Sequence, residues 1–140
     1  MLVGHGRILT MYDIGKKRLL RKAENKRVVP NRICTLQVYG ERVFVSDIQE
    51  GIHVVIYHAE QNLFFVTANE SIPRWVTSTA LVDFSTVAGG DKFGNLFVVR
   101  LPPEANRAVE DNPSAGSVRE GDFTLDHRLT QEVSFHAGSM

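Results

Sequence analysis

The residues best suited to chemistry are a serine–aspartate pair and a few histidines, and none of them stands in a catalytic pattern. Ser46 and Asp47 precede His53 and His58, which are the residue types that a hydrolase uses. A serine nucleophile on a sharp turn needs Gly-x-Ser-x-Gly, and the residues around Ser46 do not fit it. His5 stands between two glycines with no other histidine, cysteine or acid close by in sequence, so we expect it in an exposed turn.

The sequence indicates neither a nucleotide site nor a metal site. The turn Gly89-Gly90-Asp91-Lys92 could offer backbone N–H groups to a phosphate, but it lacks the Gly-x-x-x-x-Gly-Lys-Ser/Thr pattern. Cys34 has only Arg32 as a basic neighbour and is expected to be a small core residue. Without ligand spacing, a triad or paired carboxylates, we expect no enzyme, no catalytic residue, no metal, no cofactor and no small-molecule substrate.

Charge is divided unevenly along the chain although the net charge is zero. Residues 1–40 carry a net charge of +7 and residues 41–140 a net charge of −7. Basic clusters attract phosphates, but no aromatic residues alternate with these for base stacking, so a solvated edge or a protein contact is favoured and RNA contact is expected to be weak or indirect. Residues 15–26 are compatible with a short helix or an edge strand. The candidate contact residues are Lys16, Lys17, Arg18, Arg21, Lys22, Lys26 and Arg27.

Short strands joined by hairpins must position these residues. Apolar, β-branched and aromatic runs alternate with Gly, Asn and Asp, which is typical of hairpins. Pro73 would fix the start of a strand, and Trp75 is expected to pack against a neighbouring blade rather than to be an exposed anchor for a partner. The predicted strands are residues 7–13, 33–39, 42–47, 52–57, 63–67, 75–82 and 96–101, with turns at 49–51, 68–70, 89–91 and 93–95.

A repeat organises the strands. Gly6, Gly51 and Gly94 begin similar segments 45 and 43 residues apart, and Asp47 and Asp91 precede the last two. Each glycine would free the backbone for a tight turn and each aspartate would cap that turn. About four strands per ~40–50 residues is the pattern of a propeller blade.

The chain therefore holds about three blades, whereas propellers close with roughly four to eight. The predicted fold class is all-β: a partial β-propeller of about three consecutive four-stranded antiparallel blades of a longer chain. We expect residues 1–140 to be a fragment of a C-terminal β-propeller. Residues 102–122 are rich in Pro, Ala, Asn, Ser and Gly and are expected to be a mobile loop inserted within a blade, after which residues 123–135 resume a strand pattern.

These segments also carry a family resemblance. IPRWVTSTALVDFSTVAGGDKFGNLFVVRLPPEAN, GKKRLLRKAENK and RVFVSDIQEGIHVVIY resemble the C-terminal propeller (CPSF A subunit region) of the large propeller subunit, subunit 3, of the splicing factor 3b complex. The wider family includes the damaged-DNA-binding ubiquitin ligase adaptor and the large cleavage and polyadenylation specificity factor subunit. PRWVT and AGGDKFGNLFVVRLPP favour the splicing member. The resemblance covers roughly residues 2–103 and resumes weakly at 135–138.

The resemblance implies a nuclear, non-catalytic scaffold segment that acts in pre-mRNA splicing. Its partners would be the other subunits of the splicing factor 3b complex, including the HEAT-repeat subunit. Two alternatives stay open: a direct nucleic-acid-binding propeller module, and a DNA-damage ubiquitin-ligase adaptor. A single cysteine suits a reducing compartment. The N-terminal residues do not form a signal peptide and no run of ~20 apolar residues occurs, so no membrane association is expected.

Overall fold

β-Strands arranged in three sheets dominate the computed structural model, which describes residues 1–15, 17–103, 123–124 and 133–134. The strands are β1 (Leu2–His5), β2 (Ile8–Ile14), β3 (Leu19–Asn25), β4 (Ile33–Tyr39), β5 (Arg42–Asp47), β6 (Gly51–His58), β7 (Leu63–Asn69), β8 (Val76–Asp83), β9 (Thr86–Asp91), β10 (Asn95–Arg100), β11 (Phe123–Thr124) and β12 (Val133–Ser134). Within these ranges, no helix has the length and apolar character needed to cross a membrane.

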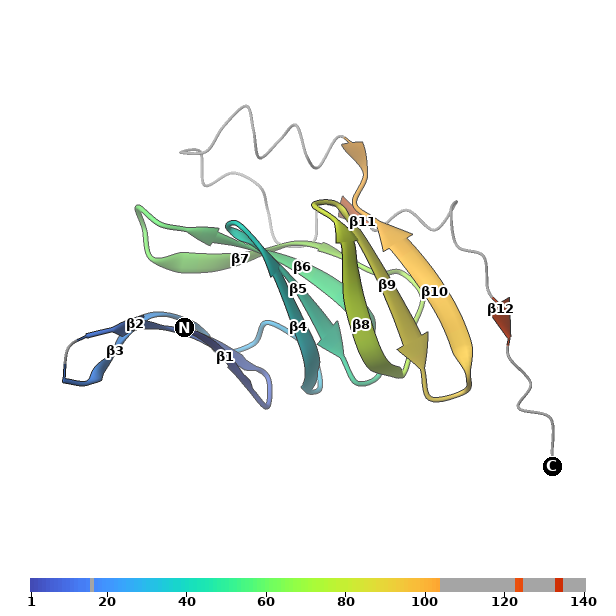
Figure 1. Ribbon diagram of the computed structural model, residues 1–140, viewed down its shortest axis with the longest axis horizontal. Helices are drawn as coiled ribbons and strands as arrows, with labels where there is room; N and C mark the ends of the chain where they lie inside the picture. The colour runs from blue at the N-terminus through green and yellow to red at the C-terminus, as the bar shows by residue number, and fades with distance from the viewer. Residues whose placement is uncertain (16, 104–122, 125–132, 135–140) are drawn as a thin grey trace.

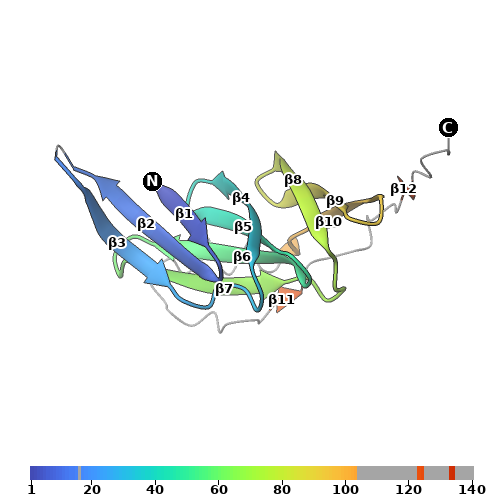
Figure 2. The same ribbon diagram turned by 90° about the horizontal axis from the view of Figure 1, so that it is seen from below.

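The three sheets follow one plan, in which strands consecutive in the chain pair antiparallel. The first sheet has the order β1-β2-β3, the second β4-β5-β6-β7 with β11 beside β7, and the third β8-β9-β10-β12. The pairing of β11 with β7 is parallel. The sheets lie side by side in chain order (Figures 1 and 2). Four-stranded antiparallel sheets placed next to one another are propeller blades, so the predicted all-β partial propeller is confirmed.

The sequence repeat aligns equivalent strands of the three sheets. Gly6, Gly51 and Gly94 stand at or just before β2, β6 and β10, and their φ angles are 59°, 82° and 87°. Because β2 follows the first of these glycines, β1, β2 and β3 occupy the second to fourth positions of a blade. The outermost strands β3 and β7 contact each other, as do the innermost strands β4 and β8.

Two apolar clusters hold the sheets together, one on each face of the second sheet. Val43, Val45 and Val55 face the first sheet and pack against Leu9. Phe44 and its neighbours face the third sheet on the other side. Side chains alternate between the faces of a strand, so a sheet buried on both faces needs a continuous apolar run. This is why the central strand β6, GIHVVIYH, is buried almost throughout.

The prediction of a turn at residues 89–91 is wrong. Gly89, Gly90 and Asp91 are the last residues of strand β9, and the turn follows at residues 92–94. Gly89 pairs with Phe97 of β10, and a Cβ atom on this glycine would lie 2.5 Å from Phe97 Cζ. Glycine is therefore required here because the aromatic ring lies against the backbone of the opposite strand.

The other predicted strands agree with the structure to within two residues. Of the two alternatives for residues 15–26, the structure has the edge strand, since among the described strands β3 pairs with β2 alone. In the expected loop 102–122, only Pro102 and Pro103 are described, and the rest lies outside the described residues. Of residues 123–135, the pairs in β11 and β12 are described, and β12 extends the third sheet beside β10. Residues 135–138 also lie outside the described ranges.

The hairpins divide the molecule into two ends. The β1–β2 and β9–β10 turns lie along the lower edge of Figure 1, and the β4–β5 and β8–β9 turns lie along its upper edge. The loops that lead from one blade to the next, residues 26–32 and 70–75, start and finish at the strand ends of the lower edge. Most of the polar contacts that hold the loops in place lie along this edge.

Candidate functional site

The predicted basic region does not form one patch. Lys17 and Arg18 lie in the β2–β3 turn, whereas Lys26 and Arg27 lie past the other end of β3, and a seven-residue strand is ~23 Å long. Of the two cations between them, Arg21 pairs with Glu24 at 3.2 Å and Lys22 lies 6.0 Å from the ring centroid of Tyr57. Lys16 lies outside the described residues. The region is thus divided between the two ends of the molecule.

The carboxylate of Asp47 organises two loops at once. It accepts hydrogen bonds from the backbone N–H groups of Gln49 at 2.8 Å and Glu50 at 3.1 Å, within its own turn. It also accepts from the backbone N–H groups of Asn31 at 2.8 Å and Arg32 at 3.1 Å, in the loop from the preceding blade. Burial disfavours the charged form, but these hydrogen bonds outweigh it and lower the pKa of Asp47 below its ordinary value.

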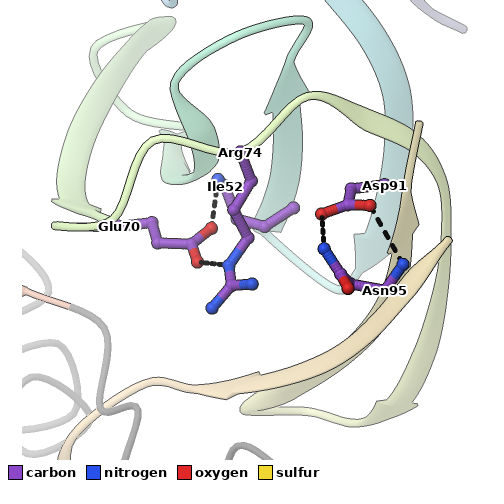
Figure 3. Close-up of polar contacts among 5 residues, drawn as sticks. All are labelled: Ile52, Glu70, Arg74, Asp91 and Asn95. Carbon is purple, nitrogen blue, oxygen red and sulfur yellow. Dashed lines mark hydrogen bonds and ion pairs between the residues drawn. The ribbon is translucent and has the colours of Figure 1, made fainter. Parts of the chain in front are cut away.

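Asp91 performs the matching task in the third sheet. Its carboxylate accepts a hydrogen bond from the backbone N–H of Phe93 at 2.8 Å. It also accepts from both the backbone and the side-chain amide of Asn95, at 3.1 and 2.8 Å (Figure 3). Burial works against ionisation here too, and the contacts with Asn95 and Phe93 nevertheless lower the pKa of Asp91. Both predicted aspartates therefore hold the turn that follows them.

A buried ion pair joins the second blade to the third. Glu70 accepts from Arg74 Nε at 2.5 Å and from the backbone N–H of Ile52 at 3.0 Å (Figure 3), and neither charged side chain is more than 4% exposed. Burial raises the pKa of Glu70, and the bond to Arg74 opposes this effect. The guanidinium also lies over the ring of Phe97, 4.8 Å from its centroid. At Gly51, a Cβ atom would lie 2.3 Å from Glu70 Oε2, so this glycine makes room for the carboxylate.

Sequence reasoning did not identify Glu70 and Arg74 as partners. The sequence does show an acidic and a basic residue four positions apart, with Pro73 between them. This spacing alone does not show that both side chains point into the protein. Glu70 had been predicted as the last residue of a turn that simply separates two strands.

Backbone hydrogen bonds tie all these loops into one continuous surface. Val28 N donates to Arg7 O at 3.1 Å, and Ile48 N donates to Arg32 O at 2.9 Å. The series then continues from Gly51 N to Arg74 O at 3.2 Å and from Lys92 N to Trp75 O at 2.9 Å. Each loop between blades is thus bonded to the hairpin turn beside it. We call this surface the loop rim and define it as residues 6–7, 26–32, 48–50, 70–75 and 92–94.

Two predictions of buried side chains are wrong. Trp75 is 37% exposed on the loop rim, where Lys92 Nζ lies 3.2 Å from the centroid of its ring. The preceding Arg74 takes the inward position to reach Glu70, so the tryptophan points outward. Cys34 is exposed as well, with its Sγ 3.8 Å from the carbonyl oxygen of Thr77.

The residues considered for catalysis are not assembled. Ser46 pairs with Ile52 across the strands, so it and His53 project from opposite faces of the sheet, and Ser46 Oγ is 2.7 Å from Thr35 Oγ1. His5 is exposed at the end of β1. Among residues with described positions, no group of three histidine, cysteine or acidic side chains is placed to hold a metal ion. What the described residues do assemble is a set of loops held in place by carboxylates.

These features define a class of protein: an all-β, propeller-type module whose loops are fixed by backbone-directed polar contacts. A family model described as "CPSF A subunit region" matches residues 1–140, and the chain belongs to that family.

Curated relatives agree with this assignment. The chain is 41% identical over 143 residues to spliceosome-associated protein 130 A of Arabidopsis thaliana, and 45% identical over 144 residues to splicing factor 3B subunit 3 of Drosophila melanogaster. Both matches cover 100% of this chain and 12% of the relative. Splicing factor 3B subunit 3 of Danio rerio is 46% identical over 114 residues, which are 81% of this chain and 9% of the relative. The chain thus spans about an eighth of the first two relatives, and the predicted resemblance is confirmed.

Proposed function

We propose that this chain is a non-catalytic scaffold segment that acts in pre-mRNA splicing through protein–protein contacts. The observation that carries the proposal is similarity along the whole chain to relatives named splicing factor 3B subunit 3. In this proposal the chain is nuclear and its partners are the other subunits of a splicing factor 3b complex, including the HEAT-repeat subunit. The loops and turns supply contact surfaces, because a rigid set of sheets presents them in fixed positions.

The open face of the third sheet supports the view that the chain is one part of a larger propeller. Val82 is 61% exposed and Leu96 is 47% exposed. Leu96, Val98 and Ala88 line a shallow depression of about 340 Å³ on this sheet. Both faces of the second sheet are covered by neighbouring blades, so the equivalent occupant of this open face is a further blade. The relatives are long enough to provide one, because the chain covers only 12% of the first of them.

The test is an immunoprecipitation from the source cells with an antibody against the peptide 15–26. We expect splicing factor 3b subunits to co-purify, with the HEAT-repeat subunit among them. A precipitate that contains cullin-family proteins and no splicing factors would instead favour the DNA-damage adaptor. A precipitate with neither would refute the scaffold proposal. An antibody against an unrelated nuclear protein of similar abundance serves as the control for non-specific capture.

A further inference from the structure

The loop rim brings together cations that are scattered in the sequence. Besides its exposed basic residues, the described rim carries one exposed acidic residue, Glu50. The carboxylates of Asp47 and Asp91 at the adjoining strand ends are occupied with backbone N–H groups. We propose that the loop rim binds single-stranded nucleic acid. The basic residues are Arg7, Lys26, Arg27, Arg32 and Lys92.

A groove at one end of the rim is suited to the sugar–phosphate backbone. It encloses about 540 Å³ between the first two sheets, with Arg7 and Arg27 on its walls. Arg7 Nη1 donates to the carbonyl oxygen of Pro30 at 3.4 Å, which holds this guanidinium beside the groove. Val66 contributes an apolar surface, and Asn69 contributes an amide. The groove therefore combines cations for phosphates with an apolar surface against which a sugar or base can pack.

Aromatic rings stand at the other end of the rim. Phe93 is 67% exposed and Trp75 is 37% exposed, and Lys92 Nζ lies 3.2 Å from the tryptophan centroid and 5.0 Å from the phenylalanine centroid. One cation beside two exposed rings matches one nucleotide, with the base on a ring and the phosphate on the ammonium group. These aromatic residues are distant in sequence from residues 16–27, and the fold places them on the same edge.

Arg32 connects the two ends of this path. Its loop is bonded to the β5–β6 turn through Ile48, and that turn is bonded in turn to the loop that leads to Trp75. Packed sheets lie ~10 Å apart, so a rim across three sheets is ~20 Å long. This length equals about six nucleotides at the ~3.4 Å rise of a stacked duplex strand, and fewer where the strand is extended.

The aromatic rings decide between nucleic acid and an acidic protein segment. Exposed cations alone would attract either polyanion, whereas Phe93 and Trp75 add stacking surfaces that only bases use fully. The opposite end of the molecule also has exposed aromatic rings, Tyr39 and Phe84, but an acidic residue, Glu41, lines the same pocket. There Phe84 stacks on Arg42, whose Nη1 donates to the carbonyl oxygen of Phe84 at 2.5 Å, and Glu41 lies in the adjacent turn.

Fluorescence anisotropy with a labelled 15-nucleotide oligouridylate tests the proposal on the full chain. The affinity should fall steeply with salt, and Arg27→Ser/Arg32→Ser should reduce the slope of log K against log salt by about 1.4, at ~0.7 per phosphate contact on single strands. Phe93→Ala should weaken binding at least about 5-fold. All three side chains are exposed, and circular dichroism should show that each variant keeps its strands.

Matched controls come from the opposite end. Lys17→Ser/Arg18→Ser removes the same charge, Phe84→Ala removes an equally large ring, and both should change the affinity less than 2-fold. Absence of oligouridylate binding, or equal losses in the control variants, would overturn the proposal. Displacement by polyglutamate as effective as by unlabelled oligouridylate, with no effect of Phe93→Ala, would assign the rim to an acidic protein segment. The splicing assignment does not depend on any of these results, because co-purifying subunits test it separately.

Discussion

Replacing Gly51 with alanine tests whether the ion pair between blades depends on the absence of a side chain at this position. The φ of +82° costs an L-residue about 1–2 kcal/mol. The new Cβ would also lie 2.3 Å from Glu70 Oε2, and such overpacking adds about 1–3 kcal/mol. Gly51→Ala should therefore lower the free energy of unfolding by about 2–5 kcal/mol.

Gly6→Ala is the matched control. Gly6 also has a positive φ, of 59°, but no atom lies within 4 Å of its added Cβ. This substitution should cost only the backbone strain of about 1–2 kcal/mol. Urea unfolding followed by circular dichroism and by the fluorescence of Trp75, the single tryptophan, measures both variants. Equal losses at the two glycines would refute the steric argument.

A double-mutant cycle identifies the partner. Glu70→Ala leaves the buried Arg74 guanidinium without this carboxylate and should cost about 3–5 kcal/mol by itself. When Glu70 is already shortened, the added Cβ of Gly51→Ala no longer meets its oxygen. The double variant should then be more stable than the sum of the single effects predicts, by about 1–3 kcal/mol. Strict additivity would mean that the alanine collides with something other than the Glu70 carboxylate.

Three further outcomes follow from the same contacts. Gly89→Ala should lower the free energy of unfolding in urea by about 1–3 kcal/mol, because its Cβ would meet Phe97 at 2.5 Å. Gly90→Ala, whose nearest neighbour would lie at 3.5 Å, should cost less than about 1 kcal/mol. The reverse order would contradict the assignment of Gly89 to the strand. Because the pKa of Asp47 is lowered in the folded state, its charged form stabilises the fold above the ordinary aspartate pKa of about 3.9, and this contribution is lost as the pH falls through the lower folded value. The urea midpoints of Asp47→Asn should therefore depend less on pH between 5 and 3 than those of the parent chain. Parallel pH profiles of the two proteins would argue against this role of Asp47. The exposed thiol of Cys34 should react with a disulfide reagent in the native state within about 10-fold of its rate in urea, and a thiol that reacts only after unfolding would be inconsistent with the structure.

Local signals in the sequence are sufficient to predict most of the fold. A glycine at positive φ and an aspartate that caps a turn act within a few residues, so Gly51 with Asp47, and Gly94 with Asp91, mark the β5–β6 and β9–β10 hairpins wherever the rest of the chain goes. The 43- to 45-residue spacing then shows that the hairpins are equivalent. Element type and order follow from these signals, because neither depends on contacts between sheets.

Features that arise between sheets could not be predicted in the same way. Gly89 looks like a turn residue until the ring of Phe97 is seen against it, and Trp75 looks like a core residue until Arg74 is seen to take the inward position. Cys34 is apolar enough for a core, yet the edge strand β4 leaves it exposed. The neighbour that decides for Gly89 lies on another strand, and the direction of Arg74 beside Trp75 depends on its pairing with Glu70, so residue type alone does not reveal either outcome.

The separation of apolar and polar contacts explains how such a module can bind partners without losing its fold. The apolar clusters lie between the sheets, whereas the loops are held by Asp47, Asp91 and the Glu70–Arg74 pair through backbone N–H groups and an ion pair. A carboxylate that bonds to backbone does not restrict which exposed side chains the loop carries. The rim side chains can therefore vary to suit a partner while these carboxylates keep the loops in position. Substitutions at Phe93 should change binding with little effect on unfolding, and substitutions at Glu70 should do the opposite.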